Sequence, residues 1–313
     1  SICLLSSIIV LLNPIANAQD EGAKIAKWGV YITNIYNANL ADNSFNIDFW
    51  WWSNHEDTTL SFDGTVDVPD AKSLTTSHFE RHIINDMVWE VNKISANVSM
   101  NWDILNYPFD KPQLFVRLES SIDEINKLRI INDSIRSAIN KNIKIQNLIV
   151  DSFKLVKGEV PYNTDFGDPS AEYRCTYSGL FMKIDCHREA WGIYFKLCIG
   201  LFVAFLISFL AFFIEPEYFD ARFGTAVGGL FAAVGNKYVC ESQFPSSATF
   251  TLIDKIHGIV FILIFMVMLI ITTSLYFKVT NQLNTAKRID RISALILGVL
   301  FATTITYITS ISQ

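Results

Sequence analysis

Charged residues are scarce in this 313-residue chain and make up only 18% of it. Soluble domains average about 25% charged residues, so the composition disfavours an ordinary cytosolic enzyme. The sequence also lacks the basic excess of a general nucleic-acid binder, because its net charge is −6. It contains no nucleophile elbow, phosphate-binding loop or dinucleotide fingerprint, so no motif predicts an enzyme.

Cysteine and histidine are also rare, with five of each. Cys175 and Cys186 could pair in an oxidising compartment, but at the two ends of one extended strand they would lie about 35 Å apart, which favours free thiols. His78 and His82 could share a metal ion, although a solvated surface is the favoured interpretation. We therefore predict no cofactor and no definite metal site, with Ca²⁺ modulation through acidic side chains as an alternative.

Hydrophobic residues make up half of the chain, and charge is divided unevenly along it. Residues 19–189 hold 17 basic and 25 acidic residues, a net of −8, whereas the remainder holds 8 basic and 6 acidic residues, a net of +2. The sequence therefore predicts an acidic domain at residues 19–190 and an apolar domain at residues 191–313.

The first 18 residues resemble a secretory signal, truncated at its start. The apolar stretch Ile8–Leu12 precedes the small residues Ala16–Ala18, after which we expect cleavage. An anchoring helix is the alternative, but Pro14 follows a short apolar run and makes it less favourable. Export would place the acidic domain outside the cytoplasm.

Short alternating segments indicate strands throughout the acidic domain. Val30–Ile32 and Phe45–Phe49 alternate apolar with polar residues, the two-residue period of a half-buried strand. Many such segments separated by turn residues predict a β-sandwich or barrel. We expect Thr76–Asp86 to be the exception, as a candidate short helix.

Four helices are predicted in the apolar domain, at about residues 192–214, 222–244, 251–277 and 289–312. Three contain uncharged apolar runs near the ~20 residues that a spanning helix needs. The second is also long enough, although it is rich in Gly and Ala. Four spans after an exported domain would return the C-terminus to the outside. The loop between the last two would then be cytoplasmic, as the positive-inside rule prefers for its basic residues Lys278, Lys287, Arg288 and Arg291.

The second of these helices has an unusual face. Helical steps of three or four residues define what we call the candidate pore face: Asp220, Gly224, Gly228, Phe231, Gly235, Tyr238 and Glu241. If several copies surrounded an axis, Asp220 would form a charged ring that selects cations and Phe231 an apolar constriction that gates by dewetting. The alternative is a tightly packed helix, because Gly224 and Gly228 form a small-residue packing motif. The sequence alone does not decide between the two.

Several motifs resemble those of a known family. Tyr107, Pro108, Phe109 and Asp110, followed by Gln113-Leu114, look like the signature loop of the pentameric ligand-gated ion channels, the Cys-loop receptor superfamily. The turn Glu241–Pro245 and the basic Arg188 before the first span are similar to those of bacterial members. The signature loop lacks flanking cysteines and has one extra residue before Gln113.

The resemblance implies a β + α membrane protein, with a periplasmic β-sandwich ligand domain followed by a four-helix transmembrane bundle, assembled as a homopentamer. Phe109 and Asp110 would contact the membrane domain, with Asp110 near Arg188. Asp42 is a weaker candidate for this contact, and Pro245 would end the pore helix. The alternative role for Asp110 and Arg188 is a purely stabilising ion pair.

The resemblance also implies a ligand site between subunits, lined by aromatic residues. Trp51, Tyr162 and Tyr173 are the candidates, although each aromatic is more often a core residue. We expect a cation channel in a bacterial inner membrane, in contact with lipids and conducting monovalent cations for a small-molecule or ion ligand. A periplasmic sensor with four anchoring spans is the main alternative, and a membrane enzyme or transporter is another.

Overall fold

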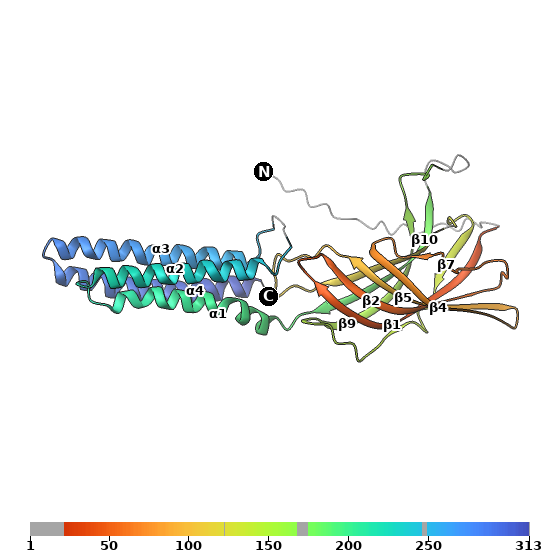
Figure 1. Ribbon diagram of the computed structural model, residues 1–313, viewed down its shortest axis with the longest axis horizontal. Helices are drawn as coiled ribbons and strands as arrows, with labels where there is room; N and C mark the ends of the chain where they lie inside the picture. Colours follow the sequence, from red (N-terminus) through yellow and green to blue (C-terminus); the bar gives the residue numbers. More distant parts are fainter. Residues whose placement is uncertain (1–21, 122, 168–174, 246–248, 313) are drawn as a thin grey trace.

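The computed structural model describes residues 22–121, 123–167, 175–245 and 249–312. A β-rich region is followed by four α-helices, and the two parts lie end to end along the longest axis of the molecule (Figure 1). The predicted signal at residues 1–18 and the ligand candidate Tyr173 lie outside the described residues.

The described strands form two sheets that enclose one hydrophobic core. The first sheet has the order β4-β5-β2-β1-β7, with β8 paired to β1, and the second has the order β3-β6-β10-β9. The first sheet consists of β1 (Lys24–Asn39), β2 (Ser44–His55), β4 (Ala71–Ile84), β5 (Met87–Ser99), β7 (Leu128–Asn132) and β8 (Ala138–Ile139). The second consists of β3 (Val66–Asp67), β6 (Gln113–Ser120), β9 (Ile149–Pro161) and β10 (Thr176–His187).

Strand β2 shows why these residues form a sheet. Its buried and half-buried positions alternate along almost its whole length, so one face packs into the core. Trp51 lies on the core face with no exposed surface, and its ring packs edge-on against Trp28 and Phe62 at 5.0 and 5.7 Å. The prediction of Trp51 as a ligand contact is therefore corrected to a core role.

The expected short helix at Thr76–Asp86 is wrong. This segment belongs largely to β4, which pairs antiparallel with β5 at the edge of the first sheet. Most β4 side chains are exposed on both faces, so the sequence carries no two-residue period there. A register shift between Ser77 and Glu80 interrupts the strand further, and His78 adopts a left-handed φ of 67° within it.

The helices form near their predicted positions. They are α1 (Ala190–Leu210), continued by the short 3₁₀ helix η1 (Ala211–Phe213), then α2 (Phe219–Glu241), α3 (Leu252–Val279) and α4 (Leu283–Ile311). Helix α3 begins with a capping box, in which Thr251 and Asp254 each accept a backbone N–H of the other. Helix α4 begins several residues earlier than expected.

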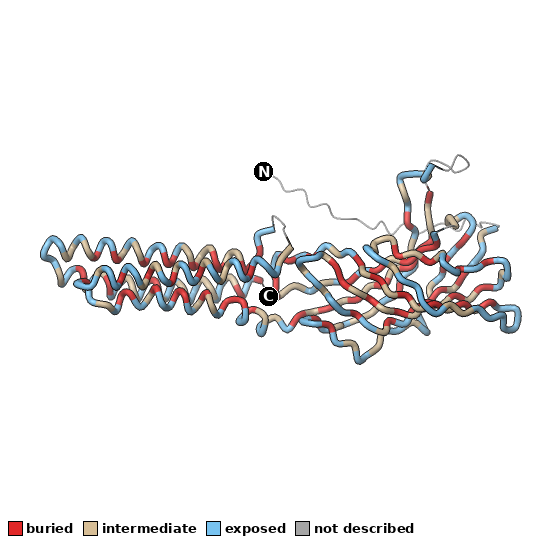
Figure 2. Tube along the Cα trace, in the orientation of Figure 1, coloured by how far each residue is buried: buried red, intermediate tan, exposed pale blue. Residues whose placement is uncertain are grey.

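Three of the described helices are long and apolar enough to cross a membrane: α1 with η1, α3 and α4. This indicates a membrane protein. Helix α2 is not among them, which corrects the expectation that all four helices qualify. Its length is sufficient, but Asn236, Lys237 and its glycines lower its hydropathy below that of the other three helices. Buried residues, red in Figure 2, concentrate where the helices face one another and where the two sheets face one another.

Helices α1 and α2 cross closely at Gly229. A Cβ atom added there would lie 2.0 Å from Ser208 Oγ and 2.6 Å from the Ala204 carbonyl oxygen. At the neighbouring Gly228, an added Cβ would meet no described atom within 4 Å. The close packing within the protomer therefore uses Gly229 rather than the motif of Gly224 and Gly228.

These adjacent glycines give a matched pair of variants. We expect Gly229→Ala to lower the free energy of unfolding by about 1–3 kcal/mol, because the added methyl group separates two packed helices. Gly228→Ala should be neutral or raise it by about 0.5–1 kcal/mol through the lower chain entropy of the unfolded state. Thermal unfolding of the detergent-solubilised protein measures both. Equal effects would show that the crossing is not close.

Candidate functional site

The candidate pore face is uncovered in the protomer. All seven of its residues are exposed, including Phe231 near the middle of α2 with 71% of its surface accessible. The opposite side of α2 packs against the other helices through Arg222, Ala226, Gly229, Ala233 and Cys240. The candidate pore face is therefore a continuous exposed stripe, which we call the free stripe, on the one described α-helix that is not apolar enough to be a candidate span.

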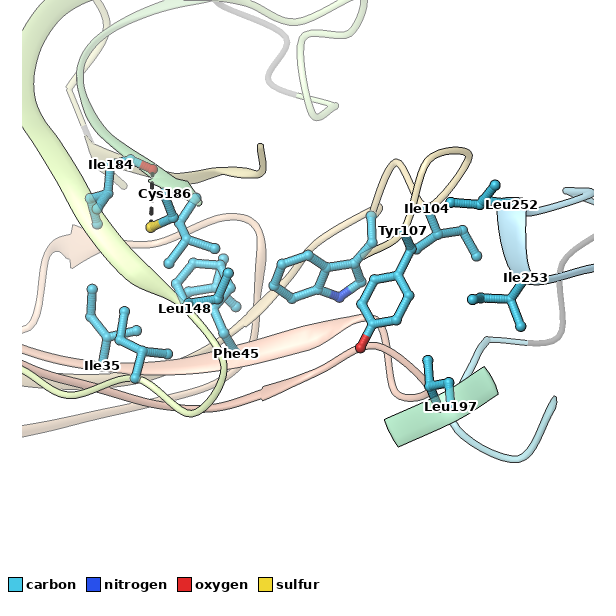
Figure 3. Packing of buried hydrophobic residues seen from close by; sticks show 14 of the residues in the cluster. Ile35, Phe45, Ile104, Tyr107, Leu148, Ile184, Cys186, Leu197, Leu252 and Ile253 are labelled. Atoms are coloured by element: carbon cyan, nitrogen blue, oxygen red, sulfur yellow. Dashed lines mark hydrogen bonds between the residues drawn. The ribbon is translucent and has the colours of Figure 1, made fainter. Parts of the chain in front are cut away.

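The predicted signature loop joins the two parts of the molecule. It lies between β5 and β6, and the Leu105 carbonyl oxygen accepts a hydrogen bond from the Leu252 N–H at the start of α3, at 2.9 Å. The ring of Tyr107 packs edge-on against Phe244, in the link from α2 to α3, at 5.2 Å. Figure 3 shows the Ile104 side chain extending from this loop toward Leu252 and Ile253. We call this contact region the junction.

Phe109 and Asp110 contact the beginning of α1 at the junction. The ring of Phe109 lies 5.4 Å from Trp191 and 5.9 Å from Tyr194. Arg188 Nε donates to both carboxylate oxygens of Asp110, at 2.8 and 3.0 Å. The two charged side chains are only 4% and 8% exposed, so this is a buried ion pair.

The rings of Tyr107 and Trp102 also pack against the Arg188 guanidinium. Its guanidinium carbon lies 4.9 Å from the Tyr107 ring centre and 5.8 Å from that of Trp102, within cation–π range. Burial raises the pKa of the Tyr107 phenol, so the ring stays neutral at physiological pH. Arg188 lies in the chain between β10 and α1, and its side chain thus attaches this point of the backbone to the loop between β5 and β6.

Asp42 lies near this ion pair but not in it. It occupies the turn between β1 and β2, where its carboxylate accepts a hydrogen bond from Asn39 and its backbone carbonyl accepts one from Lys72. Together with Arg188 and Gln243 it lines a polar cavity of about 430 Å³ beside the junction. Pro245 follows the end of α2 and lines a smaller cavity of about 260 Å³.

Tyr162 belongs to an aromatic cluster at the end of β9. Its ring packs edge-on against Phe166 and Tyr177, at 5.3 and 5.6 Å, and its hydroxyl donates to Glu119. The Arg117 guanidinium lies 5.9 Å from the Tyr162 ring centre. Burial raises the pKa of the Tyr162 phenol, and the Glu119 carboxylate raises it further, so the hydroxyl remains a donor.

The same cluster predicts a pH effect on stability. Burial raises the pKa of the Glu119 carboxyl above its usual value, although the Tyr162 hydroxyl opposes this rise. When the pKa of a carboxyl is higher in the folded state than in the unfolded state, the protonated group favours folding at pH values below the unfolded-state pKa. This stabilisation is lost as the pH rises through the folded-state pKa. As the pH rises from about 4 to about 7, the free energy of unfolding should therefore fall less in the Glu119→Gln variant than in the wild type. Parallel curves of unfolding midpoint against pH would contradict this.

A second aromatic and polar cluster was not predicted from the sequence. On β4, His78 Nε2 and His82 Nε2 lie 2.8 and 3.6 Å from the two carboxylate oxygens of Glu80. The His78 ring packs edge-on against Trp50, and the His82 ring stacks on Trp89. Alternation along β2 could have found Trp50, because it lies on the face opposite to Trp51.

The structure also places the candidate metal and thiol residues. Within the described ranges, no group of three or more His, Cys, Asp or Glu side chains is arranged to hold a metal ion. Cys175 and Cys186 are both buried, at the two ends of β10, and are not joined by a disulfide.

Comparison with known proteins adds no family assignment, since neither a protein-family model nor a curated protein matches the chain.

Proposed function

We propose that this chain is the subunit of a homopentameric, ligand-gated cation channel in which α2 lines the pore. The observation that carries the proposal is the free stripe on α2. Helix α2 is less apolar than the other three helices, which are long and apolar enough to cross a membrane. A ring of protomers with α2 inside and the other helices outside fits both observations.

The stripe also has the composition of an ion path. Asp220 and Glu241 supply carboxylates near its two ends, and small residues alternate with Phe231 and Tyr238 between them. In a ring, the carboxylates attract monovalent cations and Phe231 provides an apolar constriction that dewets when closed. Unlike a packing surface, this stripe leaves Gly224 and Gly228 without described neighbours in the protomer.

Gating requires a physical connection between the ligand domain and α2. The junction supplies one through the buried pair of Asp110 and Arg188 and the contact of Tyr107 with Phe244. A ligand that binds the open arrangement more tightly shifts the population toward it by that difference in affinity. This proposal assigns Phe109, Asp110 and Arg188 to coupling as well as to stability.

The ligand would bind between neighbouring protomers. The cluster around Tyr162 lies where β9 runs into the loop toward β10, and the cluster around Trp50 and His78 lies on the edge strand β4 and its neighbours. In a ring, the Tyr162 cluster of one protomer would face the cluster of Trp50 and His78 on the neighbouring protomer. Aromatic rings with nearby carboxylates suit a cationic ligand.

We place the channel in a bacterial inner membrane, with the β-rich domain and the C-terminus in the periplasm. The basic residues in the last turn of α3 and the first turns of α4 support this orientation under the positive-inside rule; they are Lys278, Lys287, Arg288 and Arg291. The resemblance of the signature loop and the element order to bacterial pentameric channels supports the same assignment.

Two measurements on purified protein test the proposal. Mass determination of the detergent-solubilised complex should give five copies, and reconstitution into a planar bilayer should give cation currents. A panel of amines, protons and divalent cations serves as the ligand screen. A monomer or dimer without conductance would overturn the proposal and favour a sensor with anchoring spans.

A further inference from the structure

A charged side chain is buried at the end of the helical bundle where α2 begins. Arg222, in the first turn of α2, is 1% exposed. Its Nε donates to the Ala211 carbonyl oxygen at 3.0 Å, and its Nη1 donates to Ser274 Oγ at 3.4 Å. These contacts tie α2 to η1 and α3.

The charge of Arg222 is balanced from the fourth helix. Arg222 Nη2 lies 2.8 Å from Asp290 Oδ1, and Asp290 is 4% exposed on α4. Ser274 Oγ donates to Asp290 Oδ2 at 3.1 Å, so a single hydroxyl group contacts both partners. Burying one charge without the other is strongly unfavourable, so each side chain keeps the other inside the bundle.

This arrangement separates Arg222 from Asp220. The two residues are two positions apart, which rotates their side chains by about 200° around the helix. Asp220 is exposed on the candidate pore face, whereas Arg222 points into the bundle. Glu215 and Glu217 are also exposed in the segment before α2. Within α2 and the segment before it, the exposed charge is therefore acidic, although a basic residue lies within the first turn of α2. Lys287 of α4 lies 3.5 Å from Glu215 and faces this segment from the neighbouring helix.

We infer that Asp290 determines cation selectivity from outside the pore, by holding the Arg222 guanidinium inside the bundle and away from the Asp220 ring. This inference rests on the proposed function. Asp290 acts as a positioning residue, because it touches Arg222 and not the ion path. Arg222 keeps its charge in any environment, so only its location decides whether that charge reaches the pore mouth.

Neutralising Asp290 should release Arg222. In Asp290→Asn the guanidinium loses its counter-charge, and its long side chain can extend to the nearest water at the start of α2. That movement would bring five positive charges close to the five Asp220 carboxylates. We expect the cation-to-anion permeability ratio, measured from reversal potentials, to fall roughly tenfold.

A double variant distinguishes a positioning role of Asp290 from a purely structural one. Arg222→Gln/Asp290→Asn removes both charges and should restore the wild-type permeability ratio. A purely structural role predicts no such recovery of selectivity. Asp220→Asn serves as the positive control for lost selectivity, and Glu56→Gln, an exposed acid of the β-rich domain, serves as the neutral control.

Thermal unfolding of the same variants tests the pairing without conduction. Each single neutralisation should lower the unfolding midpoint by roughly 6 °C or more, and the double variant should lose less than the sum of the two. Additive losses would overturn the inference. A selective wild type with an unchanged ratio in Asp290→Asn would overturn the inference alone. A wild-type protein that conducts nothing would overturn the proposed function, and the inference would fall with it.

Discussion

Replacing Phe231 with alanine should produce a channel that passes current without ligand. The phenyl ring lies near the middle of the free stripe on α2, with 71% of its surface exposed in the protomer. Five such rings around an axis form an apolar constriction, whose closed state depends on excluding water. Alanine removes most of that apolar volume, so we expect ligand-free conductance in a planar bilayer to rise about tenfold or more.

Stability should not change greatly in this variant. The exposed ring is not part of the protomer core, so its loss should alter the free energy of unfolding by about 0.5 kcal/mol or less. Phe213→Ala is a matched control, because that ring is 70% exposed but lies in η1, away from the stripe. An unchanged ligand-free current in Phe231→Ala, or an equal increase in Phe213→Ala, would exclude Phe231 as the gate.

Asp110→Asn should be the most damaging substitution at the junction. It leaves the Arg188 guanidinium buried and charged without its partner, because arginine does not deprotonate in proteins. Breaking a buried ion pair in this way costs about 3–5 kcal/mol. We therefore expect a clear fall in the unfolding midpoint of the detergent-solubilised protein and loss of ligand-dependent currents.

A neighbouring ion pair provides the control. Asp151 pairs with His187, one residue before Arg188, at 2.6 Å, but both side chains are more than 40% exposed. Asp151→Asn should change stability by less than about 1 kcal/mol, because solvent screens exposed pairs. Equal losses in the two variants would show that burial does not distinguish these pairs. Normal ligand responses in Asp110→Asn would confine the pair to a stabilising role.

The helices and the free stripe could be predicted from the sequence because their signals are local. Steps of three or four residues along one helix are enough to select the stripe, and all its predicted members are exposed. The approach of Asp110 to Arg188 was accessible only through the resemblance to a known family. Their separation along the chain leaves no periodic pattern that connects them.

Other features depend on partners far away in the sequence. Strand β4 is polar on both faces, so only its pairing with β5 identifies it as a strand. Alternation along β2 shows that adjacent tryptophans point in opposite directions, but the position of the second sheet decides that Trp51 is the buried one. Arg222 lies two residues from Asp220 along the chain, and only the fold, which brings Asp290 of α4 to it, shows that its charge is buried.

The hydrogen bond from the Leu252 N–H to the Leu105 carbonyl has a consequence for engineering. Because donor and acceptor are both backbone groups, ordinary side-chain replacements do not remove this hydrogen bond. The contact between the β-rich region and α3 is therefore insensitive to most substitutions at these two positions. Proline is the exception. Leu252 is the first residue of α3, where the pyrrolidine ring fits the helical geometry, and the preceding Thr251 is already extended with ψ of 168°. A prolyl residue would thus fit the backbone at the helix start and remove one donor, but it would also replace the fully buried Leu252 side chain.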